Sequence, residues 1–247
     1  MCLRGRFSGA QAFVWSNDLE QLQNGFTLKL CPGAFPLSTD SVALAGFVKL
    51  PPKATVLDLG SGCGTLGLML CAADKNCSVT GVELDENAHH TALENSRRNG
   101  VSNRLLSICG DIVRIPEMIA PGSFRCCISN PPYFVGGPAS RSHPTARQED
   151  SCTLDALLSS AAWALQYGGD FYLVHRPERL AEIFAKASSL HLEPKRLCLL
   201  RHRENGPVTL VLIQCRKGGK PGLSWEEWAL FDAQGNPTER YKTLYHL

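Results

Sequence analysis

From Ala54 onward, short apolar runs alternate with segments of helical length, and this alternation limits the possible folds more than any other feature of the sequence. Repeated strand–helix steps build a parallel sheet that is covered by helices on both faces. The last two runs are joined by the turn-forming residues Glu204 to Pro207, which predict an antiparallel hairpin. We therefore predict an α/β fold with a seven-stranded, doubly wound, Rossmann-like sheet that ends in a C-terminal β-hairpin. The expected strands are 54–60, 78–85, 104–111, 124–130, 169–175, 195–201 and 208–217.

The two ends of the chain are less periodic than its centre. We predict that residues 1–50 form an N-terminal extension that packs on the core, and that residues 51–247 form one domain with a C-terminal tail. Trp225 and Trp228 indicate that this tail packs onto the domain. Helices are expected at 65–74, at 86–99 with Gly100 as the C-terminal cap, at 153–166, and after Pro177.

The net charge leaves the partner open, whereas the cysteines and the apolar stretches argue against disulfides, a metal site and a membrane span. The formal net charge of +2 is too small to identify a nucleic-acid partner. The eleven cysteines include no C-x-x-C pair, and Cys126 and Cys127 would point to opposite faces of one strand, so we expect reduced thiols and no metal site. A signal peptide is not recognisable, and no apolar stretch approaches the roughly 20 residues that cross a bilayer. We therefore expect a cytoplasmic protein that does not bind a membrane.

A glycine-rich loop follows the first core strand, in the segment DLGSGCG at 58–64. Glycines at this place let the backbone approach a ligand before a helix begins, so Gly60, Ser61, Gly62 and Gly64 are candidate cofactor-binding residues. The stretch GCGTLG also fits G-x-G-x-x-G, which is a weak indication of a nicotinamide cofactor. Asp58 argues against that cofactor because a carboxylate would repel a pyrophosphate. S-adenosylmethionine has no phosphate and offers an ammonium group to pair with.

Acidic residues also end the next two strands. Glu83 could accept hydrogen bonds from ribose hydroxyls, and Asp111 could lie beside the adenine amine, with Leu84 and Ile112 as their neighbours in the cofactor site. The alternative is that each acid caps the following helix, a common role for Asp. We favour cofactor binding because the acids follow three successive strands beside a glycine loop.

The segment NPPY at 130–133 follows the fourth strand, where it would reach the same crevice. A conjugated amine is a poor nucleophile because its lone pair is delocalised. Asn130 Oδ1 and the Pro131 carbonyl could hold its hydrogens, Pro132 would stiffen the turn, and Tyr133 would stack on a base or an amide. We predict that these four residues are catalytic, that Asn130 also contacts the cofactor, and that Phe134 helps to bind the substrate. A simple Asn-Pro-Pro turn is the alternative.

These motifs resemble those of class I S-adenosylmethionine-dependent methyltransferases, whose motif I corresponds to VLDLGSGCG and whose amino-methyltransferase motif IV corresponds to NPPY. The segments FPLSTDSVALAGF (35–47), ARQED (146–150) and 230–246 resemble the bacterial valine-tRNA adenine-N6 methyltransferase family. The resemblance implies methylation of the exocyclic amine of the adenosine at tRNA position 37. It also implies that Thr39 and Asp40 lie over the methionine end of the cofactor, and that Arg147 and Glu149 are loop residues at the substrate.

Two other functions remain open. N5-glutamine methyltransferases that act on translation release factors resemble the chain equally well at NPPY, although they usually carry a helical N-terminal domain. A catalytically silent RNA-binding protein with this fold would have no chemical need for both the acids and NPPY. The candidate RNA contacts are Arg141, His143, Arg147, Arg201 to Arg203, Arg216, Lys217 and Lys220, and the alternative for each is a solvated surface charge.

Overall fold

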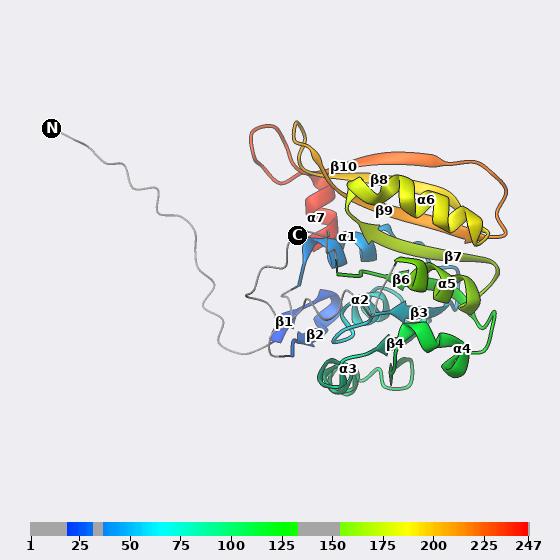
Figure 1. The fold of residues 1–247 in the computed structure, drawn as a ribbon. Coiled ribbons are helices and arrows are strands. Elements are labelled where there is room, and N and C mark those ends of the chain that lie inside the picture. The colour runs from blue at the N-terminus through cyan, green and yellow to red at the C-terminus, as the bar shows by residue number, and fades with distance from the viewer. Residues whose placement is uncertain (1–18, 32–36, 133–153, 247) are drawn as a thin grey trace, which may run out of the picture.

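A computed structural model describes residues 19–31, 37–132 and 154–246. Its centre is an eight-stranded sheet in the order β10-β8-β9-β7-β6-β3-β4-β5 (Figure 1). The strands β3 to β7 are parallel to one another, β9 is antiparallel to β7 and to β8, and β10 is parallel to β8. The strands are β3 Thr55–Leu59, β4 Ser78–Glu83, β5 Leu105–Cys109, β6 Phe124–Ser129, β7 Leu165–His175, β8 Leu192–Arg203, β9 Val208–Lys217 and β10 Ser224–Phe231.

The predicted α/β sheet and its C-terminal antiparallel hairpin are confirmed, but the predicted number of seven strands is wrong. The eighth strand, β10, comes from the segment that we expected to be a packed tail. It pairs with β8, with Trp225 opposite Leu197 and Trp228 opposite Leu200. Only the second half of β10 alternates between buried and partly exposed side chains, so its sequence lacks the full period-2 pattern of a half-buried strand.

Helices cover both faces of the sheet, and each face has its own apolar core (Figure 1). Side chains of α1, α2 and α7 lie in one core, and side chains of α4, α5 and α6 lie in the other. Cys126 belongs to the first core and Cys127 to the second, which confirms that these neighbours point to opposite faces. The helices are α1 Thr39–Phe47, α2 Thr65–Ala73, α3 Glu86–Arg98, α4 Ile115–Met118, α5 Leu154–Ala164, α6 Leu180–Ser189 and α7 Glu239–Tyr245.

A small hairpin of β1 (Leu19–Gln21) and β2 (Thr27–Lys29) is bound to α3 through two asparagines. The Asn95 side chain accepts from the backbone amide of Lys29 and donates to its carbonyl, and the Asn99 side chain does the same with Thr27. All four hydrogen bonds are 2.8 Å long. Asn95 also donates to the Cys63 carbonyl at 2.9 Å, so the hairpin is linked to the glycine loop. The division of the chain at residue 50 stays a prediction.

Within the described ranges there are also three short 3-10 turns, at Gln23–Gly25, Ile112–Arg114 and Pro177–Arg179. The nine cysteines within the described ranges are free thiols. Among the helices that the structure describes, none is long and apolar enough to span a membrane.

Candidate active site

The glycine loop lies where β3 ends and α2 begins, as its sequence predicts. Gly60, Gly62 and Gly64 have φ of +73°, +54° and +82°, a backbone region that L side chains rarely adopt. The amides of Gly60 and Ser61 both donate to the Val82 carbonyl, at 2.9 and 3.1 Å. The loop is therefore held against the end of β4, with α2 starting directly behind it.

Gly81 in β4 makes this close approach possible. A Cβ at residue 81 would lie 2.5 Å from Ser61 Oγ and 2.7 Å from Ser61 Cβ, distances that require a shift of the loop. Our sequence analysis did not identify Gly81, although an isolated glycine inside a strand is a known sign of close backbone approach.

Glu83 fastens the loop to the end of β4. The Gly62 amide donates to Glu83 Oε2 at 2.7 Å, and the Asp85 amide donates to Glu83 Oε1 at 2.8 Å. Asp85, not Glu83, caps α3 by accepting from the Ala88 amide at 2.8 Å. The helix-cap alternative is therefore excluded for Glu83.

Asp111 does act as a cap, because its carboxylate accepts from the Val113 amide at 2.9 Å at the start of the 3-10 turn after β5. Its neighbour Ile112 is buried in the core, whereas Leu84 after β4 is 50% exposed. An exposed leucine beside two strand-end acids offers an apolar surface to a flat ring. Little of the Ile112 side chain is available for such a contact.

Asp58 at the end of β3 is the most unusual group of the site. It is 1% exposed, and neither carboxylate oxygen has a hydrogen-bond partner among the described residues. Burial, and then the charge of Glu83, raises the pKa of Asp58 to about 8, and the Gly67 amide, which does not reach hydrogen-bond geometry with the carboxylate, offsets only part of this rise. Ser61 Oγ is a second buried polar atom without a partner in the described chain.

Buried polar groups are almost always hydrogen-bonded, and leaving one unpaired is costly. Two such groups at one glycine loop therefore indicate a ligand that brings donors. A carboxylate is best satisfied by a cation. The residues present thus fit S-adenosylmethionine, which carries an ammonium group, better than a pyrophosphate.

Asn130 follows β6 and lies beside the glycine loop. In the sheet, Asp58 pairs with Ile128, and the Ser129 hydroxyl donates to the Leu59 carbonyl at 2.7 Å. The end of β6 therefore lies next to the end of β3, as predicted for one shared crevice. Pro131 is buried and Pro132 is exposed.

The side-chain amide of Asn130 is bound by a residue that sequence analysis missed. Asn130 Nδ2 donates to Ser41 Oγ in α1 at 3.0 Å. Ser38 caps α1 by accepting from the Ser41 amide at 3.3 Å, and the predicted residues Thr39 and Asp40 form its first turn. Thr39 Oγ1 lies 3.3 Å from the hydroxyl of Tyr245 in α7. The structure thus brings the start of α1, which contains Thr39 and Asp40, next to Asn130.

Several predicted substrate residues lie outside the described residues. They are Tyr133, Phe134, Arg141, His143, Arg147 and Glu149.

The candidate basic RNA contacts that the structure describes lie at two opposite edges of the sheet, one formed by the carboxyl ends of the parallel strands and one formed by their amino ends. Arg201 to Arg203 end β8 at the edge that carries the site, because β8 runs in the same direction as β7. Arg216 and Lys217 end β9 at the opposite edge, where Arg216 pairs with Asp170 at 2.8 Å and Lys217 Nζ donates to two carbonyls of the chain.

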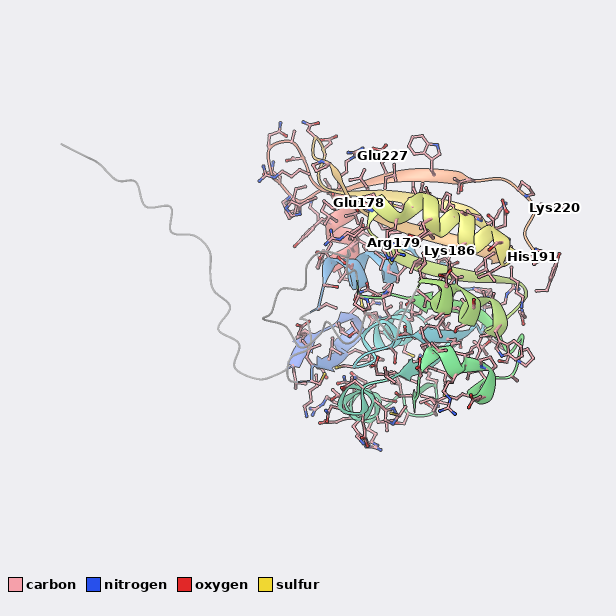
Figure 2. The ribbon with its side chains drawn as sticks, in the orientation of Figure 1. Glu178, Arg179, Lys186, His191, Lys220 and Glu227 are labelled. Carbon is pink, nitrogen blue, oxygen red and sulfur yellow. The ribbon has the colours of Figure 1, made fainter. Side chains whose placement is uncertain are left out.

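Lys220 (labelled in Figure 2) lies in the connection that follows β9, and its carbonyl accepts from Lys195 Nζ near the start of β8 at 2.9 Å. It therefore lies at the same edge as Lys217, away from the site. Arg179, which precedes α6, is ion-paired with Glu182, and Lys186 in α6 is ion-paired with Asp155 (Figure 2 labels both cations). Of the candidate cations that the structure describes, only those of Arg201 to Arg203 share the edge of the site. Within the described ranges, no group of three or more His, Cys, Asp or Glu could hold a metal ion.

Comparison with known proteins supports this description. The family model of the methyltransferase small domain matches residues 37–189. A tRNA1(Val) (adenine(37)-N6)-methyltransferase of Photobacterium profundum is 32% identical over 182 residues, which cover 72% of this chain and 76% of the relative. The same enzyme of Actinobacillus pleuropneumoniae serotype 5b is 29% identical over 215 residues, which cover 85% of this chain and 89% of the relative.

A solved structure described as a predicted O-methyltransferase from Agrobacterium tumefaciens has the same fold. Its TM-score is 0.70 with 21% identity, over 84% of this chain and 96% of that chain. The resemblance that the motifs suggested is therefore confirmed. The chain belongs to the methyltransferase small domain family.

Proposed function

We propose that the protein transfers a methyl group from S-adenosylmethionine to the exocyclic N6 amine of an adenosine in tRNA, at position 37 beside the anticodon. One observation carries the proposal. Asp58 at the glycine loop is buried, has no hydrogen-bond partner among the described residues, and lies on the strand next to the one that presents Asn130. The names of the relatives supply the tRNA and the nucleoside.

The cofactor site is proposed from the strand ends. Asp58 would pair with the ammonium group of the ligand, Glu83 would accept from its ribose hydroxyls, and Leu84 with Asp111 would border its adenine. The loop glycines 60, 62 and 64 would admit it close to the backbone, and Thr39 with Asp40 would cover its methionine end. Bound S-adenosylmethionine supplies a methyl group on a positively charged sulfur, so the protein needs no covalent intermediate.

The acceptor site is proposed from NPPY. Asn130 Oδ1 and the Pro131 carbonyl would accept the two hydrogens of the target amine and draw its nitrogen toward a tetrahedral shape. Tyr133 would stack on the flipped-out base, with Phe134 and Arg147 as further substrate contacts. Most of the catalysis would then come from orienting the amine for in-line attack.

A tRNA substrate would also place the protein in the cytoplasm, and it favours Arg201 to Arg203 over Arg216 and Lys217 as phosphate contacts. The first group shares the edge of the site, and Arg203 is exposed. The alternatives are an N5-glutamine methyltransferase acting on a release factor and a silent RNA-binding protein. The amide of a glutamine poses the same electronic problem as adenine N6, so only the substrate distinguishes the first alternative.

The test is mass spectrometry of nucleosides from tRNA that lacks N6-methyladenosine at position 37, after incubation with the purified protein and S-adenosylmethionine. We expect N6-methyladenosine with the wild type and with Asn103→Ala, a control at an exposed turn residue. We expect none with Asn130→Ala, although its cofactor affinity should persist. Cofactor binding without tRNA methylation would redirect the search to release-factor glutamine. Absence of cofactor binding would favour the silent RNA-binding protein.

A further inference from the structure

We propose that Ser41 is a positioning residue, which holds the side-chain amide of Asn130 so that its oxygen, and not its nitrogen, faces the amine that is methylated. This inference rests on the proposed function for its catalytic consequence. Its structural content is independent of that function, because it concerns a contact between α1 and the end of β6.

The direction of the hydrogen bonds supports this orientation. Asn130 Nδ2 donates to Ser41 Oγ at 3.0 Å, and Ser38 Oγ donates to the same oxygen at 3.4 Å. Ser41 Oγ therefore accepts from two sides, and a hydroxyl oxygen has only two lone pairs. With Ser41 Oγ in this acceptor role, the NH2 end of the Asn130 amide faces α1 and Oδ1 is turned to the other side.

The orientation matters because the two ends of an amide have opposite roles. An amine of an adenine ring presents hydrogens, which need an acceptor such as Oδ1. If the Asn130 amide were flipped, its own NH2 group would face the hydrogens of the substrate, and the two sets of donors would repel. Ser41 would prevent that flip, and it is 7% exposed, so water competes little for its hydroxyl.

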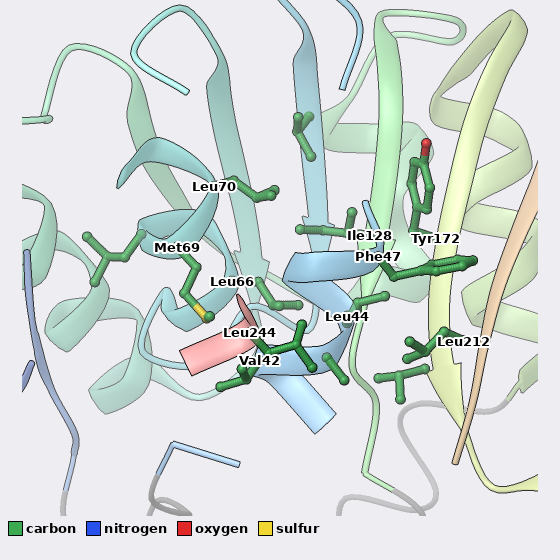
Figure 3. Close-up of a cluster of buried hydrophobic side chains, with 14 of the residues drawn as sticks. Val42, Leu44, Phe47, Leu66, Met69, Leu70, Ile128, Tyr172, Leu212 and Leu244 are labelled. Atoms are coloured by element: carbon green, nitrogen blue, oxygen red, sulfur yellow. The ribbon is translucent and has the colours of Figure 1, made fainter. Parts of the chain in front are cut away.

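The helix that carries Ser41 is firmly placed on the sheet. Figure 3 shows Val42, Leu44 and Phe47 of α1 within the core that also holds Tyr172. The Phe47 ring makes edge-on contacts with Tyr172 and Trp228, with centroids 6.2 and 6.0 Å apart. Close packing on this scale fixes the position of α1, and through Ser41 it fixes Asn130.

The test compares Ser41→Ala with Ser41→Thr, which keeps a hydroxyl, and with Ser96→Ala as the control. Ser96 is buried and donates to the Leu105 carbonyl at 2.7 Å, so its loss also removes a buried hydrogen bond, but away from Asn130. We expect kcat of Ser41→Ala to fall about 10- to 100-fold, with KM for tRNA and Kd for S-adenosylmethionine unchanged, because only orientation is lost. Ser41→Thr should recover most of kcat, and Ser96→Ala should keep it.

A second readout needs no substrate. The side-chain NH2 signals of Asn130 in 15N NMR spectra, assigned by their loss in Asn130→Ala, should shift and exchange faster with water in Ser41→Ala than in Ser96→Ala. If Ser41→Ala does not fold, the nearly isosteric Ser41→Cys, whose sulfur is a weak acceptor, replaces it in both measurements.

The outcomes separate the two proposals. A wild type that methylates no tRNA contradicts the proposed function, and the NMR signals then decide the role of Ser41 alone. An active wild type whose kcat survives Ser41→Ala overturns the positioning role. Unchanged Asn130 signals in Ser41→Ala also overturn it, and a fall in kcat that Ser96→Ala reproduces would mark the effect as general destabilisation.

Discussion

Among the single residues, Asp58 has two opposite effects, because its burial lowers the stability of the protein and favours the binding of a cation. Its carboxylate is buried and has no hydrogen-bond partner within the part of the chain that the structure describes, which destabilises the folded chain whenever the group is ionised. The same property prepares it to bind a cation, because a ligand that pairs with it removes the cost of burial. Functional groups are commonly kept in surroundings that are unfavourable to the protein without its ligand.

We expect Asp58→Asn to stabilise the protein without ligand by up to about 5 kcal/mol at pH 8, at about 1.4 kcal/mol per unit of pKa shift, and to abolish S-adenosylmethionine binding. The unfolded carboxyl ionises near its ordinary pKa of 3.8, whereas burial and Glu83 raise the folded value to about 8. Stability from this group is therefore lost as pH rises from about 4 to 8. Urea unfolding of both proteins at pH 5 and pH 8 measures the effect. If the stabilisation by Asp58→Asn does not increase between pH 5 and pH 8, the raised pKa of Asp58 is contradicted.

Cofactor binding should release a proton from Asp58 below pH 8. The complex needs the ionised carboxylate, and the folded pKa of about 8 leaves most of the protein protonated at neutral pH. The affinity for S-adenosylmethionine should then rise with pH, by up to about tenfold per unit between pH 6 and pH 8. Titration calorimetry in two buffers of different ionisation enthalpy measures the released proton. An affinity that is flat over this range would show that Asp58 is already ionised.

Sequence analysis placed Asp58, Glu83 and Asn130 at the correct edge of the sheet, because the ends of parallel strands meet there whatever the details of packing. It did not find Ser41, which contacts Asn130 across 89 residues of sequence. No local sequence pattern indicates which distant residue a side chain near the start of a helix will contact. The roles of the predicted site residues stay proposals.

At the scale of elements, the glycine loop and β4 act as a unit. The loop amides donate to Val82, and Glu83 accepts from the Gly62 amide. Gly81 leaves the space in which Ser61 lies. The position of the loop is therefore set by β4 as much as by its own glycines.

Gly81→Ala should displace the loop and weaken S-adenosylmethionine binding by about tenfold or more, while the free energy of unfolding falls by about 1–3 kcal/mol. The added Cβ would meet both Oγ and Cβ of Ser61, so the double variant Gly81→Ala, Ser61→Gly removes the clash. We expect this double variant to bind more tightly than Gly81→Ala alone. Calorimetric titration of the three proteins checks this, and equal weakening in the single and double variants would rule out the steric explanation.

Most elements could be predicted because their boundaries are set locally. The helix expected at 86–99 ends at Arg98, and Gly100 follows with φ of +66°, the left-handed conformation of a C-terminal glycine. The strand expected at 208–217 is β9 with the same bounds. The hairpin of β1 and β2 was not predicted, since three-residue strands carry too few residues for a period to be visible.

At the scale of the whole molecule, β10 connects the C-terminal segment to both the sheet and α1. Trp228 is 4% exposed, contacts Phe47, and has the guanidinium carbon of Arg240 in α7 at 4.2 Å from its ring centroid. A tail that packs onto the domain was predicted from the two tryptophans. Its entry into the sheet depends on the free edge of β8, which the sequence of the tail does not reveal.

The two tryptophans of β10 form a matched pair for testing this role. Trp228→Ala should lower the free energy of unfolding by about 3–5 kcal/mol, because a large buried side chain is lost beside Phe47. Trp225→Ala, at a side chain that is 66% exposed on the same strand, should change it by no more than about 0.5 kcal/mol. Urea denaturation of both variants gives the comparison. Similar small losses of unfolding free energy in both variants would mean that the sheet is stable without the eighth strand. A much larger loss for Trp228→Ala than for Trp225→Ala would show that β10 belongs to the core that holds α1, and with it Ser41, in place.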